Sequence, residues 1–195
     1  MPGYTYLDHA ATTPMHPESV AVMMPYLSEQ FANPSGSHRF AREARKAIDD
    51  ARELMAEVVG CRPGEVVFTS GGTEADNTAI RGTLARRGGR AVCPAAEPHA
   101  VLECVHRAGG IVVPTTVTGA ADLDALAGAL EQSTDVSVVS VMTVNNEVGT
   151  INDIAGFARV VRRHAPQAVL HTDAWLLYTS PSPRDRTRSR MPSSA

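Results

Sequence analysis

The 195-residue sequence has little of several features, and each scarcity excludes a class of protein. Its three cysteines, Cys61, Cys93 and Cys104, form neither a CxxC pair nor an even set, so we expect no disulfide framework and a cytoplasmic location. No apolar run approaches the ~18 residues of a membrane-spanning helix, and the N-terminus lacks the basic and apolar regions of a secretory signal. The net charge of −3 predicts no nucleic-acid partner.

Short apolar runs alternate with amphipathic segments along the chain. Helices are predicted at 16–31, 37–60, 71–87, 98–108, 122–131 and 153–164, and strands at 64–70, 90–95, 110–115, 136–143 and 168–173. Continuous apolar strands that alternate with helices are typical of a mostly parallel sheet covered by helices on both faces. The predicted fold class is therefore α/β.

The segments that follow the strands hold the candidate site residues, because ligands of parallel α/β sheets bind outside the carboxyl ends of the strands. After 64–70, Gly71, Gly72 and Thr73 open a helix whose free N–H groups and dipole suit a phosphate. The alternative is a plain glycine turn with Thr73 as the N-cap. Neither the GxxxxGK[ST] motif nor GxGxxG is present.

Three further strand ends carry polar residues. His99 lies near the start of a helix, where it could face a ligand or simply be a surface or capping histidine. Either Asn145 or Asn146, in VNNEVGT, could bond a ligand, although asparagines also form turns without one. Asp173 could pair with a positively charged ligand atom or cap a helix.

The combination suits pyridoxal 5′-phosphate. A helix N-terminus can hold its phosphate, and an aspartate can pair with its pyridinium nitrogen and keep the ring an electron sink. No cluster of His, Asp or Glu has the spacing of metal ligands, so a metal site is the weaker interpretation.

Six stretches together resemble the NifS/IscS-like cysteine desulfurases, which are class V, fold-type I enzymes dependent on pyridoxal phosphate. They are YLDHAATTP (6–14), NPSGSHRFAREA (33–44), VVFTSGGTEADNTAI (66–80), EPHAV (97–101), VMTVNNEVGT (141–150) and HTDA (171–174). The resemblance covers residues 4–174. It implies an N-terminal arm over 1–15 and, over 16–174, the N-terminal part of an incomplete cofactor-binding large domain.

The resemblance also implies roles for individual residues. Gly72 and Thr73 would contact the cofactor phosphate. His99 would stack on the ring and take part in proton transfers, and Asn146 would contact both the 3′ oxygen of the cofactor and the substrate. Asp173 would pair with the pyridine nitrogen.

The family converts L-cysteine to L-alanine and leaves a persulfide on an enzyme cysteine. This sulfur passes to an acceptor or scaffold protein for iron–sulfur cluster or thio-cofactor assembly, and the resemblance implies a homodimer at full length. The reaction needs a Schiff-base lysine, an acceptor cysteine and an arginine for the substrate carboxylate, which the family carries beyond HTDA.

The residues of this chain do not replace those three groups. Lys46 is the only lysine among 18 basic residues, and it falls on the polar side of the helix predicted at 37–60, whereas a Schiff-base lysine must be desolvated. None of the three cysteines falls in a matching motif. We therefore expect this fragment of the parent enzyme to be inactive.

The last segment, 175–195, departs from the family pattern and is rich in Ser, Pro and Arg. We expect it to be a non-native, adapter-like or disordered tail, because it cannot bury enough apolar surface to fold. Two alternatives for the whole chain stay open. One is another class V lyase or transferase, such as a selenocysteine lyase, and the other is a non-catalytic regulatory fragment.

Overall fold

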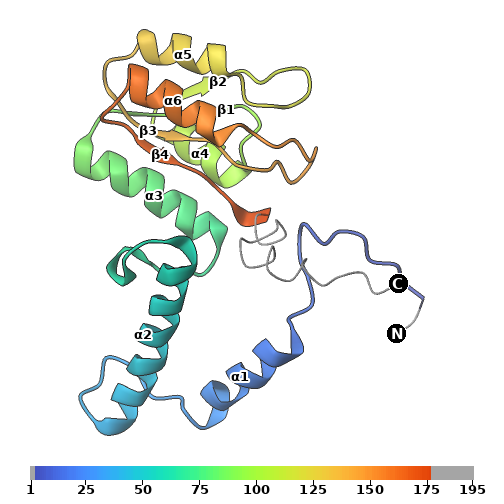
Figure 1. Ribbon diagram of the computed structural model, residues 1–195, viewed down its shortest axis with the longest axis vertical. Coiled ribbons are helices and arrows are strands. Elements are labelled where there is room, and N and C mark those ends of the chain that lie inside the picture. The colour runs from blue at the N-terminus through green and yellow to red at the C-terminus, as the bar shows by residue number, and fades with distance from the viewer. Residues whose placement is uncertain (1–2, 177–195) are drawn as a thin grey trace, which may run out of the picture. The chain divides into compact units, whose positions relative to one another are not determined.

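A computed structural model of the chain describes residues 3–176 (Figure 1). The chain divides between Phe68 and Thr69 into two compact units, which are described separately. This division differs from the boundaries predicted at 15 and 174, and those boundaries stay a prediction. The tail predicted at 175–195 lies, from residue 177 onward, outside the described residues.

The first unit is helical. It contains α1 (Pro17–Ser28), α2 (Arg39–Val59) and the short 3₁₀ helix η1 (Pro63–Glu65), which confirms both predicted helices. α2 ends at Gly60, whose φ of 74° lies in the left-handed region that favours glycine. At its other end, His38 Nδ1 accepts a hydrogen bond of 3.2 Å from the Ala41 N–H.

This unit buries little of its apolar surface in the described part of the chain. α1 has no buried residue, and α2 buries only Ala41, Ala44 and Ala56. Leu54 and Val58, on the same helix, are 55% and 54% exposed. The amphipathic pattern therefore predicted the helices correctly, but most of their apolar side chains face solvent.

The strand predicted at 64–70 is wrong. Residues 66–69 follow η1 as irregular backbone, and Val67 and Phe68 are 72% and 50% exposed. An apolar run forms a strand only where a neighbouring strand takes up its backbone hydrogen bonds, and no described strand pairs with this segment. Instead the Arg52 side chain bonds the Val66 carbonyl at 3.3 Å and lies 5.5 Å from the centre of the Phe68 ring.

The second unit is an α/β layer structure, as predicted. Its four strands are β1 (Arg90–Pro94), β2 (Ile111–Val113), β3 (Val136–Ser140) and β4 (Val169–His171), and its four helices are α3 (Gly72–Arg87), α4 (His99–Arg107), α5 (Leu123–Glu131) and α6 (Ile154–His164). The strand order is β2-β1-β3-β4, and every described pair is parallel. All four helices and the four strands of this unit confirm their predicted positions to within a few residues.

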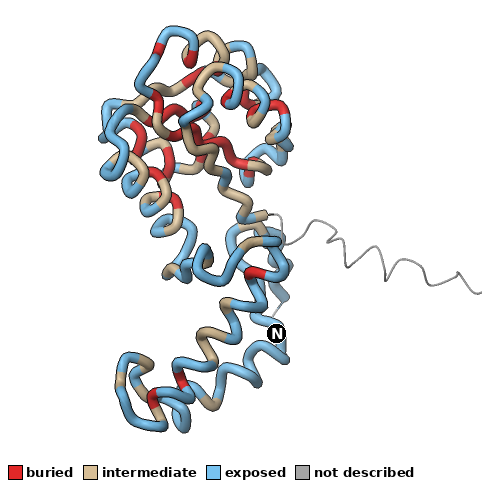
Figure 2. Tube along the Cα trace, turned by 60° about the vertical axis from the view of Figure 1, so that its left-hand side comes forward, coloured by how far each residue is buried: buried red, intermediate tan, exposed pale blue. Residues whose placement is uncertain are grey.

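Alternate residues of each strand face opposite sides of the sheet, which gives the unit two apolar cores. Val92 and Val139 pack with α5 and α6 around Phe157, whereas Cys93 and Val138 pack with α3 and α4 around Ile80. Figure 2 shows most of the buried residues in this unit. Among residues 3–176, no helix is both long and apolar enough to cross a membrane.

Candidate cofactor site

A cavity of about 290 Å³ lies at the carboxyl edge of the sheet in the second unit. It is lined by Gly72, Thr73, Asp76, Pro98, Ala100, Met142, Val144, Asn146, Asp173 and Trp175. These residues come from the start of α3, the start of α4 and the segments that follow β3 and β4. The cavity therefore lies where parallel sheets bind ligands.

The N-terminus of α3 forms one wall. Gly71 is the N-cap and offers no side-chain hydrogen bond, so the alternative that Thr73 caps the helix is wrong. Within the described chain, the N–H groups of Gly72, Thr73 and Glu74 have no acceptor. A Cβ placed on Gly71 or Gly72 would meet nothing within 4 Å, so there is open space beside these donors. Unpaired N–H groups at a positive helix end fit a phosphate.

The two asparagines after β3 have different roles. The Asn145 side chain is buried, and its amide NH₂ donates to the Ala96 carbonyl at 2.9 Å. Its Oδ1 accepts from the N–H groups of Glu147 and Val148, both at 2.9 Å. Asn146 is exposed and lines the cavity. Asn145 thus forms the turn that presents Asn146, and Asn146 is the one free to contact a ligand.

Replacing Asn145 by Ala is expected to lower the free energy of unfolding by about 1–3 kcal/mol, because three backbone groups lose their partner. Replacing the exposed Asn146 by Ala should change it by less than about 0.5 kcal/mol. Urea unfolding of the two variants measures both values. Equal effects would show that the turn does not depend on the Asn145 side chain.

Asp173 lies on the wall formed after β4. Its backbone carbonyl accepts a hydrogen bond from Thr143 at 2.9 Å, which fixes the segment against the end of β3. Its Oδ1 accepts from the Trp175 N–H at 2.9 Å, as a helix cap would. Its Oδ2 accepts no hydrogen bond from the described residues and remains free for a ligand.

His99 lies outside this cavity. It is the first residue of α4 and lines a neighbouring groove of about 580 Å³ between α3 and α4, together with Arg81 and Arg107. Thr73 and Ala100 line both the groove and the cavity. The preceding residue, Pro98, faces the cavity instead. The cavity lining thus brings together Gly72, Thr73, Asn146 and Asp173, whereas His99 lies with Thr73 in the adjoining groove, and its ring-stacking role stays a prediction.

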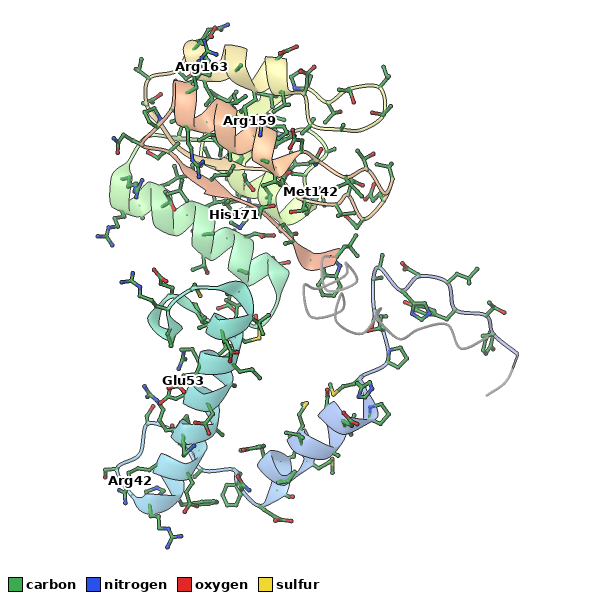
Figure 3. All side chains as sticks on the ribbon, in the orientation of Figure 1. Arg42, Glu53, Met142, Arg159, Arg163 and His171 are labelled. Atoms are coloured by element: carbon green, nitrogen blue, oxygen red, sulfur yellow. The ribbon has the colours of Figure 1, made fainter. Side chains whose placement is uncertain are left out.

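Sequence reasoning missed three polar residues at or behind the cavity, of which Asp76 and Glu97 are buried and His171 is half-buried. Asp76 follows Thr73 by one helical turn and so shares its face of α3, and His171 precedes Asp173 by two residues and so shares its side of the strand. These spacings could have identified Asp76 and His171 from the sequence as neighbours of the predicted site residues. Figure 3 labels His171 and Met142, at the ends of the neighbouring strands β4 and β3. Glu97 lies in the turn before α4, where no regular spacing relates it to a predicted site residue.

Burial perturbs the pKa values of these groups. Glu97 is 5% exposed, and its Oε1 accepts from the Met142 N–H at 2.6 Å. Burial raises the pKa of Glu97 to about 7, despite that hydrogen bond. Burial, and then the charge of Asp173, raise the pKa of Asp76 to about 6. Burial lowers the pKa of His171, which favours its neutral form.

Stability should fall as pH rises from about 4.5 to about 7. The buried Glu97 holds its proton more tightly in the folded chain than in the unfolded chain, where its pKa is ordinary at 4.5. The stability that protonated Glu97 contributes is therefore complete below pH 4.5 and is lost as the pH rises through about 7. Thermal unfolding of wild type and Glu97→Gln across this range measures it. The Gln variant should lose less stability than wild type, and parallel curves would contradict the assignment.

The other nucleophiles are unsuited to the chemistry. Lys46 is exposed on α2, and its Nζ pairs with Asp50 at 2.5 Å. The hydrogen bond to Asp50 raises the pKa of Lys46, the opposite of what a nucleophilic amine needs. Burial raises the pKa of the Cys93 thiol to about 12 and also raises that of Cys104. Residues 3–176 contain no group of three His, Cys, Asp or Glu that could hold a metal.

Comparison with known families agrees with this geometry. The class-V aminotransferase family matches residues 5–177. The chain belongs to this family. Enzymes of the family depend on pyridoxal phosphate, and the cavity offers what that cofactor needs: free helix N–H groups, an exposed amide and an aspartate with a free oxygen.

The similar proteins within the family are cysteine desulfurases of the IscS/NifS type. The chain is 41% identical over 177 residues to cysteine desulfurase IscS of Dictyoglomus turgidum, covering 87% of this chain and 44% of that protein. It is 43% identical over 181 residues to an IscS-like cysteine desulfurase of Mycobacterium tuberculosis, covering 87% and 45%. The chain thus spans less than half the length of these relatives.

Solved structures support the same fold. A NifS-like protein superposes with a TM-score of 0.79 at 30% identity, covering 86% of this chain and 47% of that one. A structure described as SspA in complex with cysteine gives a TM-score of 0.80 at 32% identity, covering 88% and 50%. The predicted membership and fold are confirmed, and the chain corresponds to part of the fold-type I architecture.

Proposed function

We propose that the parent of this chain is a cysteine desulfurase dependent on pyridoxal phosphate. In this proposal the chain supplies the residues that contact the cofactor non-covalently, and not the lysine that forms the Schiff base. The substrate would be L-cysteine, the products L-alanine and an enzyme persulfide, and the sulfur would pass to an acceptor or scaffold protein. The parent would act as a homodimer. The observation that carries the proposal is the convergence of free helix N–H groups, Asn146 and Asp173 on one cavity.

Each wall of the cavity has a distinct task. The N–H groups of Gly72 and Thr73, with the Thr73 hydroxyl, would bind the phosphate. Oδ2 of Asp173 would accept a hydrogen bond from the protonated ring nitrogen, while the Trp175 N–H holds Oδ1 in place. Asn146 would bond the 3′ oxygen of the ring and orient the substrate beside it. The cofactor, when bound, supplies an electron sink for substrate carbanions.

The chain alone is expected to turn over no L-cysteine. Its single lysine is exposed and ion-paired on α2, and two of its three cysteines are buried with raised pKa values. Assays for alanine and sulfide measure this directly. Turnover above the level of the free cofactor would show that the chain carries a catalytic lysine or cysteine function that the structure does not support.

Binding of the phosphate is tested with pyridoxine 5′-phosphate. This probe has the ring and phosphate of the cofactor but no aldehyde, so it cannot react with Lys46 or the amino terminus. Removing the phosphate, as in pyridoxine, should weaken binding at least about tenfold, because charge-assisted hydrogen bonds are lost. Fluorescence titration measures both affinities. Equal affinities would contradict a phosphate seat at α3.

A pair of threonines on α3 provides a matched control. Replacing Thr73 by Val should weaken binding of pyridoxine 5′-phosphate by a few-fold, as expected for loss of one hydrogen bond. Replacing Thr83 by Val should have no such effect, because the Thr83 hydroxyl bonds the Ala79 carbonyl at 2.7 Å and lies outside the cavity. Equal losses in the two variants would argue against a phosphate contact by Thr73.

A further inference from the structure

Four buried or half-buried side chains form a continuous row behind the cavity. His171 Nδ1 lies 2.9 Å from Ser140 Oγ, and Ser140 Oγ lies 3.4 Å from Glu97 Oε2. At the other end of the imidazole, His171 Nε2 lies 3.6 Å from Asp76 Oδ1, which is close but longer than a hydrogen bond. The row therefore joins Glu97, which is outside the cavity lining, to Asp76, which is part of it.

The row has a carboxyl group at each end and two groups between them that both donate and accept hydrogen bonds. Glu97, Ser140 and Asp76 are 5%, 1% and 4% exposed. Because the three side chains are nearly fully buried, the hydroxyl and the imidazole offer a direct path for a proton between the two carboxyls.

We propose that Asp76, His171, Ser140 and Glu97 form a proton relay, and that the position of one shared proton along it sets the negative charge at the Asp76 wall of the cavity. The inference rests on the proposed function only for the identity of the ligand that the relay serves. The four side chains act as positioning residues, since they adjust the charge around Asp173 rather than react themselves.

Two arrangements of the relay contain the same number of protons. In the first, the Glu97 carboxyl donates to Ser140 Oγ, Ser140 donates to His171 Nδ1, and the His171 Nε2–H faces the Asp76 carboxylate. In the second, protonated Asp76 donates to His171 Nε2, the Nδ1–H donates to Ser140 Oγ, and Ser140 donates to the Glu97 carboxylate. The proton thus leaves one carboxyl and arrives at the other, and the His171–Asp76 separation must shorten for this to occur.

The charge of Asp173 decides between the two arrangements. Asp173 and Asp76 line the same cavity, whereas Glu97 does not, so the negative charge of Asp173 acts more directly on Asp76. Consistent with this, Asp173 is the second cause, after burial, of the raised pKa of Asp76 and the fourth for Glu97. Neutralising Asp173 with a cationic ring nitrogen should therefore shift the equilibrium further toward the first arrangement, in which Glu97 holds the proton. Asp76 would then be anionic when the cation is present, which adds a second negative charge to the wall.

Other titratable groups that face the relay are thiols. The charge of Asp76 acts on the Cys104 thiol of α4, and the charge of Glu97 acts on the Cys93 thiol of β1. Burial raises the pKa of both thiols, so both stay neutral and neither competes for the proton. The Met142 N–H, which donates to Glu97 Oε1, fixes which oxygen of Glu97 points toward Ser140.

The tautomer of His171 reports the state of the relay, because the first arrangement places the proton on Nε2 and the second on Nδ1. Imidazole ¹⁵N shifts distinguish these forms, and the loss of one signal in His171→Gln assigns His171 among the seven histidines. Asp173→Asn should increase the Nε2–H population relative to wild type. Asp124→Asn, at an exposed position on α5, should leave it unchanged.

Glu97→Gln gives a second, stricter test. Because its carbonyl must accept from Met142, its NH₂ must donate to Ser140 and so imitate protonated Glu97. The variant should lock His171 as Nε2–H whether position 173 is Asp or Asn. The relay is overturned if Glu97→Gln has a smaller Nε2–H population than wild type, or if Asp173→Asn shifts the tautomer equally in the Glu97→Gln background.

Pyridoxine 5′-phosphate separates the relay from the proposed function. Added to the wild-type chain, it should shift His171 in the same direction as Asp173→Asn does. If both variants behave as expected but the ligand causes no shift, the relay is supported and the proposed cofactor site fails. If the ligand binds but neither variant alters the tautomer, the site stands and the relay fails.

Discussion

Replacing Asp173 by Asn is expected to weaken binding of pyridoxine 5′-phosphate by about 10–100-fold. Oδ2 of Asp173, which accepts no hydrogen bond from the described residues, would pair with the protonated ring nitrogen, and a hydrogen bond between charged groups contributes about 1.5–3 kcal/mol. Asn keeps an oxygen for the Trp175 N–H, so the local turn should survive. Isothermal titration of both proteins measures the change.

The control for this variant is Asp124→Asn. Asp124 is an exposed carboxylate on α5, in the same unit but outside the cavity lining. The Asp124→Asn substitution removes the same charge as Asp173→Asn and should leave the affinity for pyridoxine 5′-phosphate unchanged. Equal losses in the two variants would mean that net charge, and not a contact by Asp173, controls binding.

Replacing Phe157 by Ala is expected to destabilise the second unit by about 3–5 kcal/mol. Phe157 is 1% exposed and packs between α6 and the sheet, against Val92, Leu126 and Val139. Its loss leaves a cavity that close-packed neighbours fill only in part. Because whole domains are stable by only about 5–15 kcal/mol, the variant should be largely unfolded under mild denaturant.

Phe157→Leu distinguishes packing from a general effect of substitution. Leu retains most of the apolar volume, so its loss of stability should be clearly smaller than that of Ala. Circular dichroism during urea unfolding measures both. Small and equal losses would contradict a core formed between this helix and the sheet.

The second unit could be predicted from sequence because its signals are local and agree with one another. Each strand is a short apolar run, each helix has an apolar face, and caps such as Asp122 and Asp153 stand where α5 and α6 begin. The segment 64–70 has the same apolar pattern but forms no strand. The apolar pattern of this segment shows only that a strand is possible. Whether the strand forms depends on backbone hydrogen bonds to another strand, which the local sequence does not specify.

The cavity was partly predictable for a related reason. Asp173 and the glycine turn before Thr73 follow their elements directly, so the carboxyl-edge rule places them at the site. The choice between Asn145 and Asn146, and the direction in which His99 points, depend on the rotation of a turn or a helix by one residue. Sequence spacing does not determine that rotation, and in the structure Pro98 lines the cavity while His99 lines the adjoining groove.

The most direct test of the account is to locate the bound ligand. ¹H–¹⁵N spectra of the labelled chain should show that pyridoxine 5′-phosphate shifts the amides of Gly72, Thr73 and Trp175. Pyridoxine, which lacks the phosphate, should leave the amides of Gly72 and Thr73 unshifted. Shifts centred on Arg81 and Arg107 instead, in the groove between α3 and α4, would place the phosphate elsewhere and contradict the proposed site.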